Sequence, residues 1–297
     1  MKPIIVNFAP TGMIPTRAMS THVPLSVAEI VEDVHRAVEI GITMVHLHAR
    51  DETTGEPTWR SEVYGRMIEG IRRFAPELVV CVSLSGRTFG EFERRAEPLQ
   101  LGGALKPDLG SLTLSSVNFN REASVSTPAM IQALAAEMKH RGVLPELEAF
   151  DAGMINAAKY LERKGLLDPP HYFNLLLGNV AGAQADLLHA GLMVRDLPPG
   201  SLWSMAGIGD AQLSVIAMAV AAGGGVRVGL EDNLWYDRGR TRPATNADLL
   251  RRVHRLAEVN ERAVMEPGQL RALLELEPGN GRYGRRRTAC VADSVVS

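Results

Sequence analysis

The segment Met44-Val-His-Leu-His-Ala-Arg-Asp51 indicates how the whole chain folds. Its apolar residues alternate with two histidines and predict a short strand over residues 44–48, after which the chain becomes polar. A helical pattern of apolar residues precedes this strand over residues 28–40, and another follows it over residues 62–73. A short strand that alternates with longer amphipathic helices is typical of the βα units of a parallel sheet.

The same unit recurs along the chain, so that eight strands are predicted in all. They cover residues 4–8, 44–48, 78–84, 109–114, 146–150, 172–177, 202–205 and 226–230. The helices are clearest over residues 28–40, 62–73, 127–139, 154–164, 181–192 and 210–222. Eight regular units favour a closed (β/α)8 TIM barrel over an open doubly wound sheet. The first βα turn, Ala9-Pro-Thr-Gly-Met-Ile14, also lacks the Gly-rich dinucleotide fingerprint of such a sheet.

Two more helical segments, residues 246–260 and 268–276, follow the last strand. We therefore predict a single barrel domain over residues 1–277, with an extra C-terminal helical segment. Residues 278–297 are rich in Gly and Arg, and we expect them to form a tail or an arm laid on a neighbouring subunit.

Composition limits the class of partner. The 297 residues are 45% hydrophobic and carry a net charge of −2, which gives no basic excess for nucleic acid or anionic lipid. Two cysteines, Cys81 and Cys290, cannot build a disulfide framework or a Cys-rich zinc site, so a cytoplasmic setting is expected. The apolar run at 213–222 is shorter than the ~20 residues of a membrane span. A small-molecule substrate is the default expectation.

His46 and His48 are the first candidates for chemistry. Side chains alternate along a strand, so both imidazoles share one face while Leu47 takes the other. Near the C-terminal mouth of a barrel, where active sites lie, two such imidazoles can occupy adjacent positions around one Zn²⁺. The alternative interpretation is that one histidine only completes a hydrogen bond of the core.

The stretch Gly223-Gly-Gly-Val-Arg-Val-Gly-Leu-Glu-Asp-Asn233 contains the eighth strand and places Arg227, Gly229 and Glu231 on one face. In a closed barrel only the first strand separates the eighth strand from the second, so Glu231 can reach a metal held by the two histidines. A His₂-carboxylate set with open positions is expected of a catalytic metal. Gly229 would leave room for a ligand. The alternative for Glu231 and Asp232 is a solvated loop or a helix N-cap.

Arg227 also needs a partner, because a buried guanidinium without one is costly. Asp232 or a substrate carboxylate could supply it, and a salt bridge that only closes the barrel is the alternative. On the fifth strand Glu146 and Glu148 share a face, and such like-charged neighbours need a cation or raised pKa values, as at acid/base sites. Either could instead be a simple partner of a Lys or Arg.

Four hydroxyl side chains on the third and fourth strands are candidates for binding a carboxylate or carbonyl oxygen. They are Ser83, Ser85, Ser111 and Thr113. After the seventh strand, Gly207 and Gly209 open a helix, in a region where barrels often bind phosphate.

Four of these stretches together resemble the β-keto acid cleavage enzymes. They are Val45-His-Leu-His-Ala-Arg-Asp51, Lys106-Pro-Asp-Leu-Gly-Ser-Leu112, Pro145-Glu-Leu-Glu-Ala-Phe-Asp151 and the glycine-rich stretch 223–233. The resemblance implies a (β/α)8 barrel that holds one Zn²⁺ per subunit through His46, His48 and Glu231. It also implies a reaction of a β-keto acid with acetyl-CoA that gives acetoacetate and a new CoA thioester, and a tetramer is expected.

The resemblance further implies that the β-keto acid chelates the metal, which polarises its carbonyl. Asp232, paired with Arg227, would remove a proton from acetyl-CoA, and the carbanion would attack the keto carbon. Ser83 or Ser85 would supply the family's hydroxyl, and Glu146, in preference to Glu148, its glutamate. Gly207 and Gly209 would lie near the CoA phosphates. Arg87 stands where many members carry a small residue, so the resemblance does not imply which substrate side chain is bound.

Two other interpretations remain open at this stage. One is a metal-dependent lyase or hydrolase that works without CoA, either class II aldolase-like or amidohydrolase-like. Amidohydrolases, however, carry His-x-His on the first strand, which here ends Asn7-Phe-Ala-Pro10. The other is a non-catalytic barrel with structural zinc, which normally has four protein ligands where this chain offers three candidates.

Overall fold

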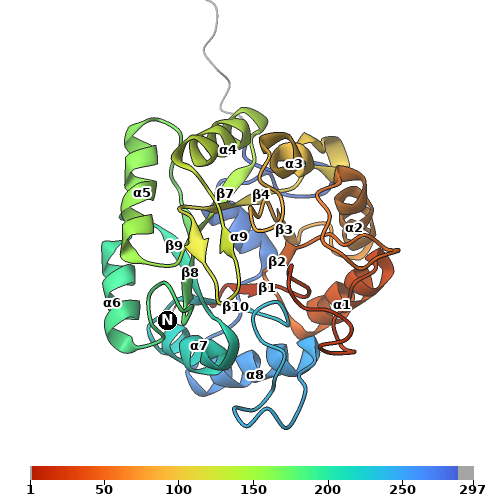
Figure 1. Ribbon diagram of the computed structural model, residues 1–297, viewed down its shortest axis with the longest axis vertical. Coiled ribbons are helices and arrows are strands. Elements are labelled where there is room, and N and C mark those ends of the chain that lie inside the picture. Colours follow the sequence, from red (N-terminus) through yellow and green to blue (C-terminus); the bar gives the residue numbers. More distant parts are fainter. Residues whose placement is uncertain (1, 287–297) are drawn as a thin grey trace, which may run out of the picture.

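Eight parallel strands close into a barrel in the computed structural model, which describes residues 2–286 (Figure 1). Around the barrel the order is β1-β10-β9-β8-β7-β4-β3-β2. The strands are β1 (Val6–Phe8), β2 (Met44–Leu47), β3 (Val79–Val82), β4 (Leu109–Thr113), β7 (Leu144–Ala149), β8 (Tyr172–Leu177), β9 (Leu202–Gly207) and β10 (Gly225–Val228). The predicted barrel is confirmed, and β1 pairs with both β2 and β10, as the placement of Glu231 required.

Helices surround the barrel on the outside (Figure 1). They are α1 (Val27–Ile40), α2 (Ser61–Phe74), α3 (Phe92–Ala96), α4 (Pro128–Arg141), α5 (Ala152–Arg163), α6 (Leu187–Asp196), α7 (Gln212–Ala221) and α8 (Asn246–Val259). The helix predicted over residues 181–192 is wrong at its start. Asp186 is the N-cap of α6 and accepts a hydrogen bond from the backbone N–H of His189, so the helix begins at Leu187.

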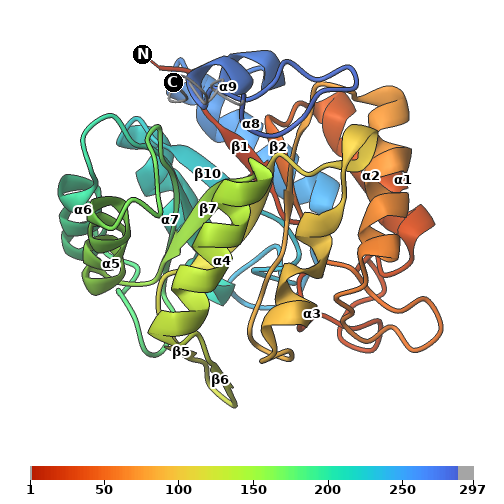
Figure 2. The same ribbon diagram turned by 90° about the horizontal axis from the view of Figure 1, so that it is seen from above.

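Each end of the barrel has its own cover. A short hairpin, β5 (Val117–Asn118) and β6 (Ala123–Ser124), projects from the end opposite helix α9 (Pro267–Leu273) (Figure 2). The hairpin follows β4 and therefore lies at the C-terminal ends of the strands, where barrels carry their active sites. It was not predicted, because two-residue strands carry too weak a pattern.

Helix α9 closes the N-terminal end of the barrel. Its Leu270 packs with Ile5, directly before β1, and Met44, at the start of β2, in one buried hydrophobic cluster. Arg271 is also buried there, and its guanidinium donates to both carboxylate oxygens of Asp108, at 2.8 and 2.9 Å. Nη2 of Arg72 lies 3.7 Å from the same carboxylate, so this end is sealed by apolar packing around Asp108 and two buried arginines.

Arg271→Met is expected to lower the free energy of unfolding by about 3 kcal/mol, because buried Asp108 would lose its closer arginine partner and keep only Arg72, at 3.7 Å. Urea unfolding of both proteins measures the difference. Arg66→Met is the matched control: it breaks an exposed pair with Glu52, which water screens, and a much smaller loss is expected. Equal losses in the two variants would contradict the role given to Arg271.

Residues 278–286 of the predicted tail continue across this same end. Tyr283 is buried under the guanidinium of Arg72, which lies 3.1 Å from its ring centre. The backbone N–H of Gly284 donates to Asp108 at 3.0 Å. The remainder of the predicted tail or oligomer arm, residues 287–297, lies outside the described residues.

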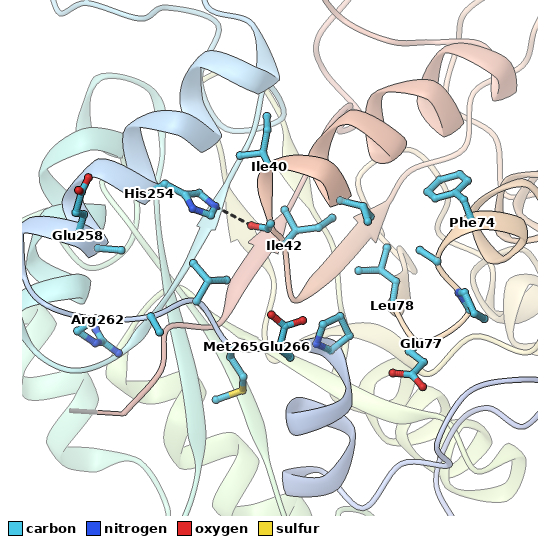
Figure 3. Close-up of a pocket in the computed structure, with 18 residues that line it drawn as sticks. Ile40, Ile42, Phe74, Glu77, Leu78, His254, Glu258, Arg262, Met265 and Glu266 are labelled. Atoms are coloured by element: carbon cyan, nitrogen blue, oxygen red, sulfur yellow. Dashed lines mark hydrogen bonds between the residues drawn. The ribbon is translucent and has the colours of Figure 1, made fainter.

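An open pocket of about 840 Å³ also lies at the N-terminal end, next to the connection from α8 to α9 (Figure 3). Apolar side chains such as Ile40, Phe74 and Leu78 line much of it, and His254 hydrogen-bonds the Gly41 carbonyl there at 2.8 Å. The predicted site residues lie at the other end. Within residues 2–286 no helix is long and apolar enough to cross a membrane.

Candidate active site

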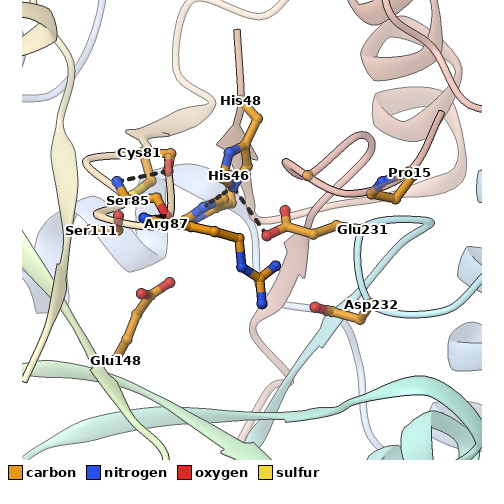
Figure 4. Close-up of polar contacts among 12 residues, drawn as sticks. Pro15, His46, His48, Cys81, Ser85, Arg87, Ser111, Glu148, Glu231 and Asp232 are labelled. Atoms are coloured by element: carbon orange, nitrogen blue, oxygen red, sulfur yellow. Dashed lines mark hydrogen bonds and ion pairs between the residues drawn. The ribbon is translucent and has the colours of Figure 1, made fainter. Parts of the chain in front are cut away.

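The two predicted histidines and Glu231 meet at the C-terminal mouth of the barrel (Figure 4). Nε2 of His48 lies 3.2 Å from Nε2 of His46 and 3.0 Å from Oε1 of Glu231. Oε2 of Glu231 is buried and has no hydrogen-bond partner within the described residues. Two ring nitrogens that face each other beside a free carboxylate oxygen fit a bound cation. The predicted ligands are therefore in place for a metal.

The loop after β1 fixes the position of Glu231. Gly12 packs so closely on it that a Cβ atom at Gly12 would lie 2.4 Å from Cγ of Glu231. Arg50, which is 2% exposed, holds this loop by donating to the carbonyls of Gly12 and Pro15, at 2.7 and 2.9 Å from Nη2. Sequence reasoning missed both residues, although a charged residue directly after the histidine strand was a signal.

Glu146 lies behind His46 rather than in the open part of the site. Its Oε2 is 2.6 Å from Nδ1 of His46, and its Oε1 accepts from the amide of Asn7 at 2.6 Å. The thiol of Cys81 lies 3.2 Å from the same Oε2. Burial alone would raise the pKa of Glu146, but His46 and Arg227 hold it below its ordinary value. A carboxylate on Nδ1 directs the other ring nitrogen, Nε2, toward the metal position.

Glu146→Gln is expected to weaken metal binding by about 10- to 100-fold, the usual effect of losing a carboxylate that orients a ligand histidine. Competition with a chelator of known affinity measures the change. Glu148→Gln is the matched control, because Glu148 contacts neither histidine. Similar metal affinities for Glu146→Gln and the wild type would show that Glu146 does not orient His46.

Arg227 gathers the acidic groups of the site. It donates from Nε and Nη2 to the two oxygens of Asp232, both at 3.1 Å, and from Nη2 to Glu231 at 2.5 Å. Its Nη1 lies 3.4 Å from Glu148. Burial raises the pKa of Asp232 to about 6, although Arg227 opposes that shift. Asp232 is thus a buried carboxylate suited to exchange a proton near neutral pH.

The four predicted hydroxyl groups divide into two pairs. Thr113 donates to Oε2 of Glu148 at 2.7 Å, and Ser111 accepts from the backbone N–H of Leu84 at 3.0 Å, so both hydroxyls contact the protein itself. The hydroxyls of Ser83 and Ser85 also accept from backbone N–H groups, those of Ser85 and Arg87, both at 3.3 Å, but these two side chains line a small pocket together with His48. The second pair is the better placed to contact a bound substrate.

The predicted glycines mainly shape loops. A Cβ atom at Gly207 would lie 2.6 Å from the Ala211 carbonyl, so glycine is needed for the turn into α7. Gly209 donates its backbone N–H to the Asp232 carbonyl at 2.7 Å. The expectation that Gly229 leaves room for a ligand is wrong, because a Cβ atom there would lie 1.9 Å from the Ala9 carbonyl. The backbone of the residue directly after β1 fills that space.

Comparison with known proteins agrees with this geometry. The sequence model of one family, described as beta-keto acid cleavage enzyme, matches residues 3–276. The chain belongs to the β-keto acid cleavage enzyme family.

Curated relatives extend over almost the whole chain. A 3-oxoadipate:acetyl-CoA acetyltransferase of Cupriavidus necator is 37% identical and the match covers 93% of this chain and 95% of the relative. A 3-keto-5-aminohexanoate cleavage enzyme of Fusobacterium nucleatum is 33% identical, with 93% and 99% covered. A 3-dehydrocarnitine:acetyl-CoA trimethylamine transferase of Rhizobium meliloti is 32% identical, with 92% and 96% covered.

A solved structure supports the fold of this β-keto acid cleavage enzyme family member. The apo structure of ObcA aligns with a TM-score of 0.75 at 20% sequence identity. The alignment covers 86% of this chain and 66% of that chain. At this identity the likeness bears on the barrel alone.

Proposed function

We propose that this protein converts a β-keto acid and acetyl-CoA into acetoacetate and a new acyl-CoA. The observation that carries the proposal is the arrangement at the barrel mouth, in a chain of this family. There His46, His48 and Glu231 meet directly beside the Arg227–Asp232 pair. The relatives' names specify different β-keto acids, so family membership leaves the side chain of the substrate open.

The metal that we propose is zinc, one ion per subunit. Two imidazole nitrogens and one carboxylate are the ligands of many catalytic zinc sites, and the free Oε2 of Glu231 accords with a cation there. Zinc bound by these residues would supply a Lewis acid for the keto oxygen. The chain itself orients the ligands, through Glu146 on His46 and the Gly12 loop on Glu231.

The atom balance of the reaction decides which proton Asp232 removes. Acetoacetate combines the acetyl group with the C1–C2 fragment of the β-keto acid, so C2 must form the new carbon–carbon bond. The proton therefore leaves C2 of the β-keto acid, and not the methyl group of acetyl-CoA as the family resemblance first implied. We assign its removal to Asp232, which Arg227 holds in place through two hydrogen bonds.

The remaining steps follow from the same balance. The C2 carbanion adds to the acetyl carbonyl, and CoA leaves as a thiolate. The thiolate then attacks C3, the C2–C3 bond breaks, and the electron pair stays on C2 of acetoacetate. Asp232 returns the proton to that carbon. Ser83 and Ser85, which line the pocket beside His48, are placed to donate hydrogen bonds to the substrate oxygens.

The loop from β9 to α7 is our proposed position for the CoA end of acetyl-CoA. Its Gly209 is hydrogen-bonded to the backbone of Asp232, so the loop borders the residue to which we assign the proton transfer. Gly207 allows the tight turn that brings this loop there. The acetyl group would thus lie within reach of the C2 carbanion.

Purified, zinc-loaded protein tests the proposal when it is incubated with acetyl-CoA and a panel of β-keto acids. We expect acetoacetate and a new acyl-CoA in equal amounts by mass spectrometry. Cleavage of a β-keto acid at the same rate without acetyl-CoA would contradict the proposal and would indicate a metal-dependent lyase or hydrolase instead.

A further inference from the structure

Arg87 is a cation at the site to which the mechanism above gives no role. It follows β3, and its guanidinium lies 3.5 Å from the ring centre of Phe119 in the loop of the β5–β6 hairpin. In Figure 4 the Arg87 side chain extends toward the space that Glu148, Glu231 and Asp232 surround. The side chain is only 16% exposed. The hairpin therefore holds a positive charge over the mouth of the barrel.

The charge of Arg87 is poorly matched within the protein. Glu122 is the one acidic group with which it pairs among residues 2–286, at 3.2 Å, and 48% of the Glu122 side chain is exposed. The contact with Glu122 is made by the Nε of Arg87, which is buried and forms no hydrogen bond in the described part of the chain. A largely buried guanidinium with unused donors calls for an anion.

The carboxylates of the site do not meet this need. Arg227 pairs with Glu148, Glu231 and Asp232, and no ion pair joins any of the three to Arg87 in the described structure. The carboxylate of Glu146 pairs with His46. Apart from Glu122, an anion for Arg87 would therefore have to come from a molecule bound at the mouth.

Stacking also prepares Arg87 to bind such an anion. A guanidinium that lies flat on an aromatic ring keeps its N–H groups in the plane, where they point outward and stay free to donate. Phe119 itself packs edge-on against Phe150, with ring centres 5.9 Å apart, which fixes the stack. A planar fork held in one orientation matches a carboxylate.

We propose that Arg87 selects β-keto acids that carry a second carboxylate, at the end of the molecule remote from the first. This rests on the proposed function. The first carboxylate must lie low in the barrel, because its neighbour C2 has to reach Asp232. Arg87 lies in the loop after β3, beyond the strand end, where it stacks on Phe119 of the hairpin, and so faces the other end of the substrate (Figure 4). An ammonium group at that end would be repelled.

Two substrates of equal length test the proposal: 3-oxoadipate, and 3-oxohexanoate, in which a methyl group replaces the second carboxylate. The wild type is expected to have the higher kcat/KM for 3-oxoadipate. Arg87→Gln is expected to lower the ratio of kcat/KM for 3-oxoadipate to kcat/KM for 3-oxohexanoate by about 10- to 100-fold, the range of a charged hydrogen bond. Arg87→Lys keeps the positive charge but lacks the planar guanidinium, and its ratio should lie between those of the wild type and Arg87→Gln.

A matched control and a second readout separate the outcomes. Arg121→Gln removes an exposed charge from the same hairpin and should leave the ratio close to that of the wild type. Binding of 3-oxoadipate without acetyl-CoA, measured by calorimetry, should weaken in Arg87→Gln by the same factor as the ratio. Melting curves check folding, and should Arg87→Gln unfold, Arg87→Lys decides.

Three results would overturn the proposal. Equal losses for both substrates would place Arg87 on the first carboxylate, and a rise in the KM of acetyl-CoA alone would place it on the CoA phosphates. An unchanged ratio of the two kcat/KM values would show that Arg87 does not select the substrate. If the wild type turns over no β-keto acid, the proposed function fails, whereas the binding measurement still decides whether Arg87 recognises the second carboxylate.

Discussion

Alanine in place of His46 is expected to abolish both metal binding and turnover. The substitution removes one of three ligands, and Glu231 and His48 alone make a weak site. Loss of the charge stabilisation that a metal supplies should lower kcat by about 10³-fold or more. Elemental analysis of the purified variant gives the metal content, and the rate of acetoacetate formation gives the activity.

The control for this substitution is His189→Ala, which removes a half-exposed histidine on α6 that pairs with Asp186. It should retain the metal and the activity of the wild type. Full metal content in the His46→Ala variant would show that the ion binds elsewhere, and the ligand assignment would then be wrong.

The second large effect is expected for Asp232→Asn. Asparagine has the same shape but cannot accept the C2 proton, so kcat should fall by about 10²- to 10⁴-fold, the usual contribution of a general base. Metal content should stay near that of the wild type, because Asp232 is not among the three ligands. Elemental analysis and steady-state kinetics on the same preparation measure both quantities.

Asp168→Asn is the matched control. Asp168 is an exposed acid in the loop before β8 and pairs with Lys139 at 2.8 Å, so its substitution should change kcat little. A kcat of Asp232→Asn near that of the wild type would exclude Asp232 as the base and would direct attention to Glu148, the other carboxylate that borders the site.

The positions of the three candidate metal ligands could be predicted from the sequence because two simple periodicities determine them. Alternation along one strand puts His46 and His48 on one face, and the closure of eight strands puts Glu231 next but one to them. Both predictions hold in the structure, where the ligand atoms of the three side chains lie within 4.8 Å of one another.

Depth within the barrel could not be predicted in the same way. Alternation gives Glu146 and Glu148 the same face, yet one lies behind His46 and the other beside Thr113. Sequence favoured Glu146 as the glutamate that acts on the substrate. The structure places it against Nδ1 of His46, where it would orient a candidate ligand, because the register between β4 and β7 decides how far each side chain lies from the mouth.

Contacts between loops could not be predicted from the sequence either. Gly229 was expected to make room for a ligand, whereas the backbone of Ala9 occupies that space. Arg87 was recognised only as a departure from the family pattern, since its stacking on Phe119 depends on a hairpin that the sequence did not predict. Tertiary packing, and not local propensity, determines both contacts.

The fate of the acetyl group tests the central claim most directly. Zinc-loaded protein is incubated with an unlabelled β-keto acid and acetyl-CoA that carries ¹³C at both acetyl carbons. We predict acetoacetate labelled at C3 and C4, together with an unlabelled acyl-CoA built from the remainder of the β-keto acid. Unlabelled acetoacetate, or label in the new acyl-CoA, would contradict transfer of the C1–C2 fragment to the acetyl group.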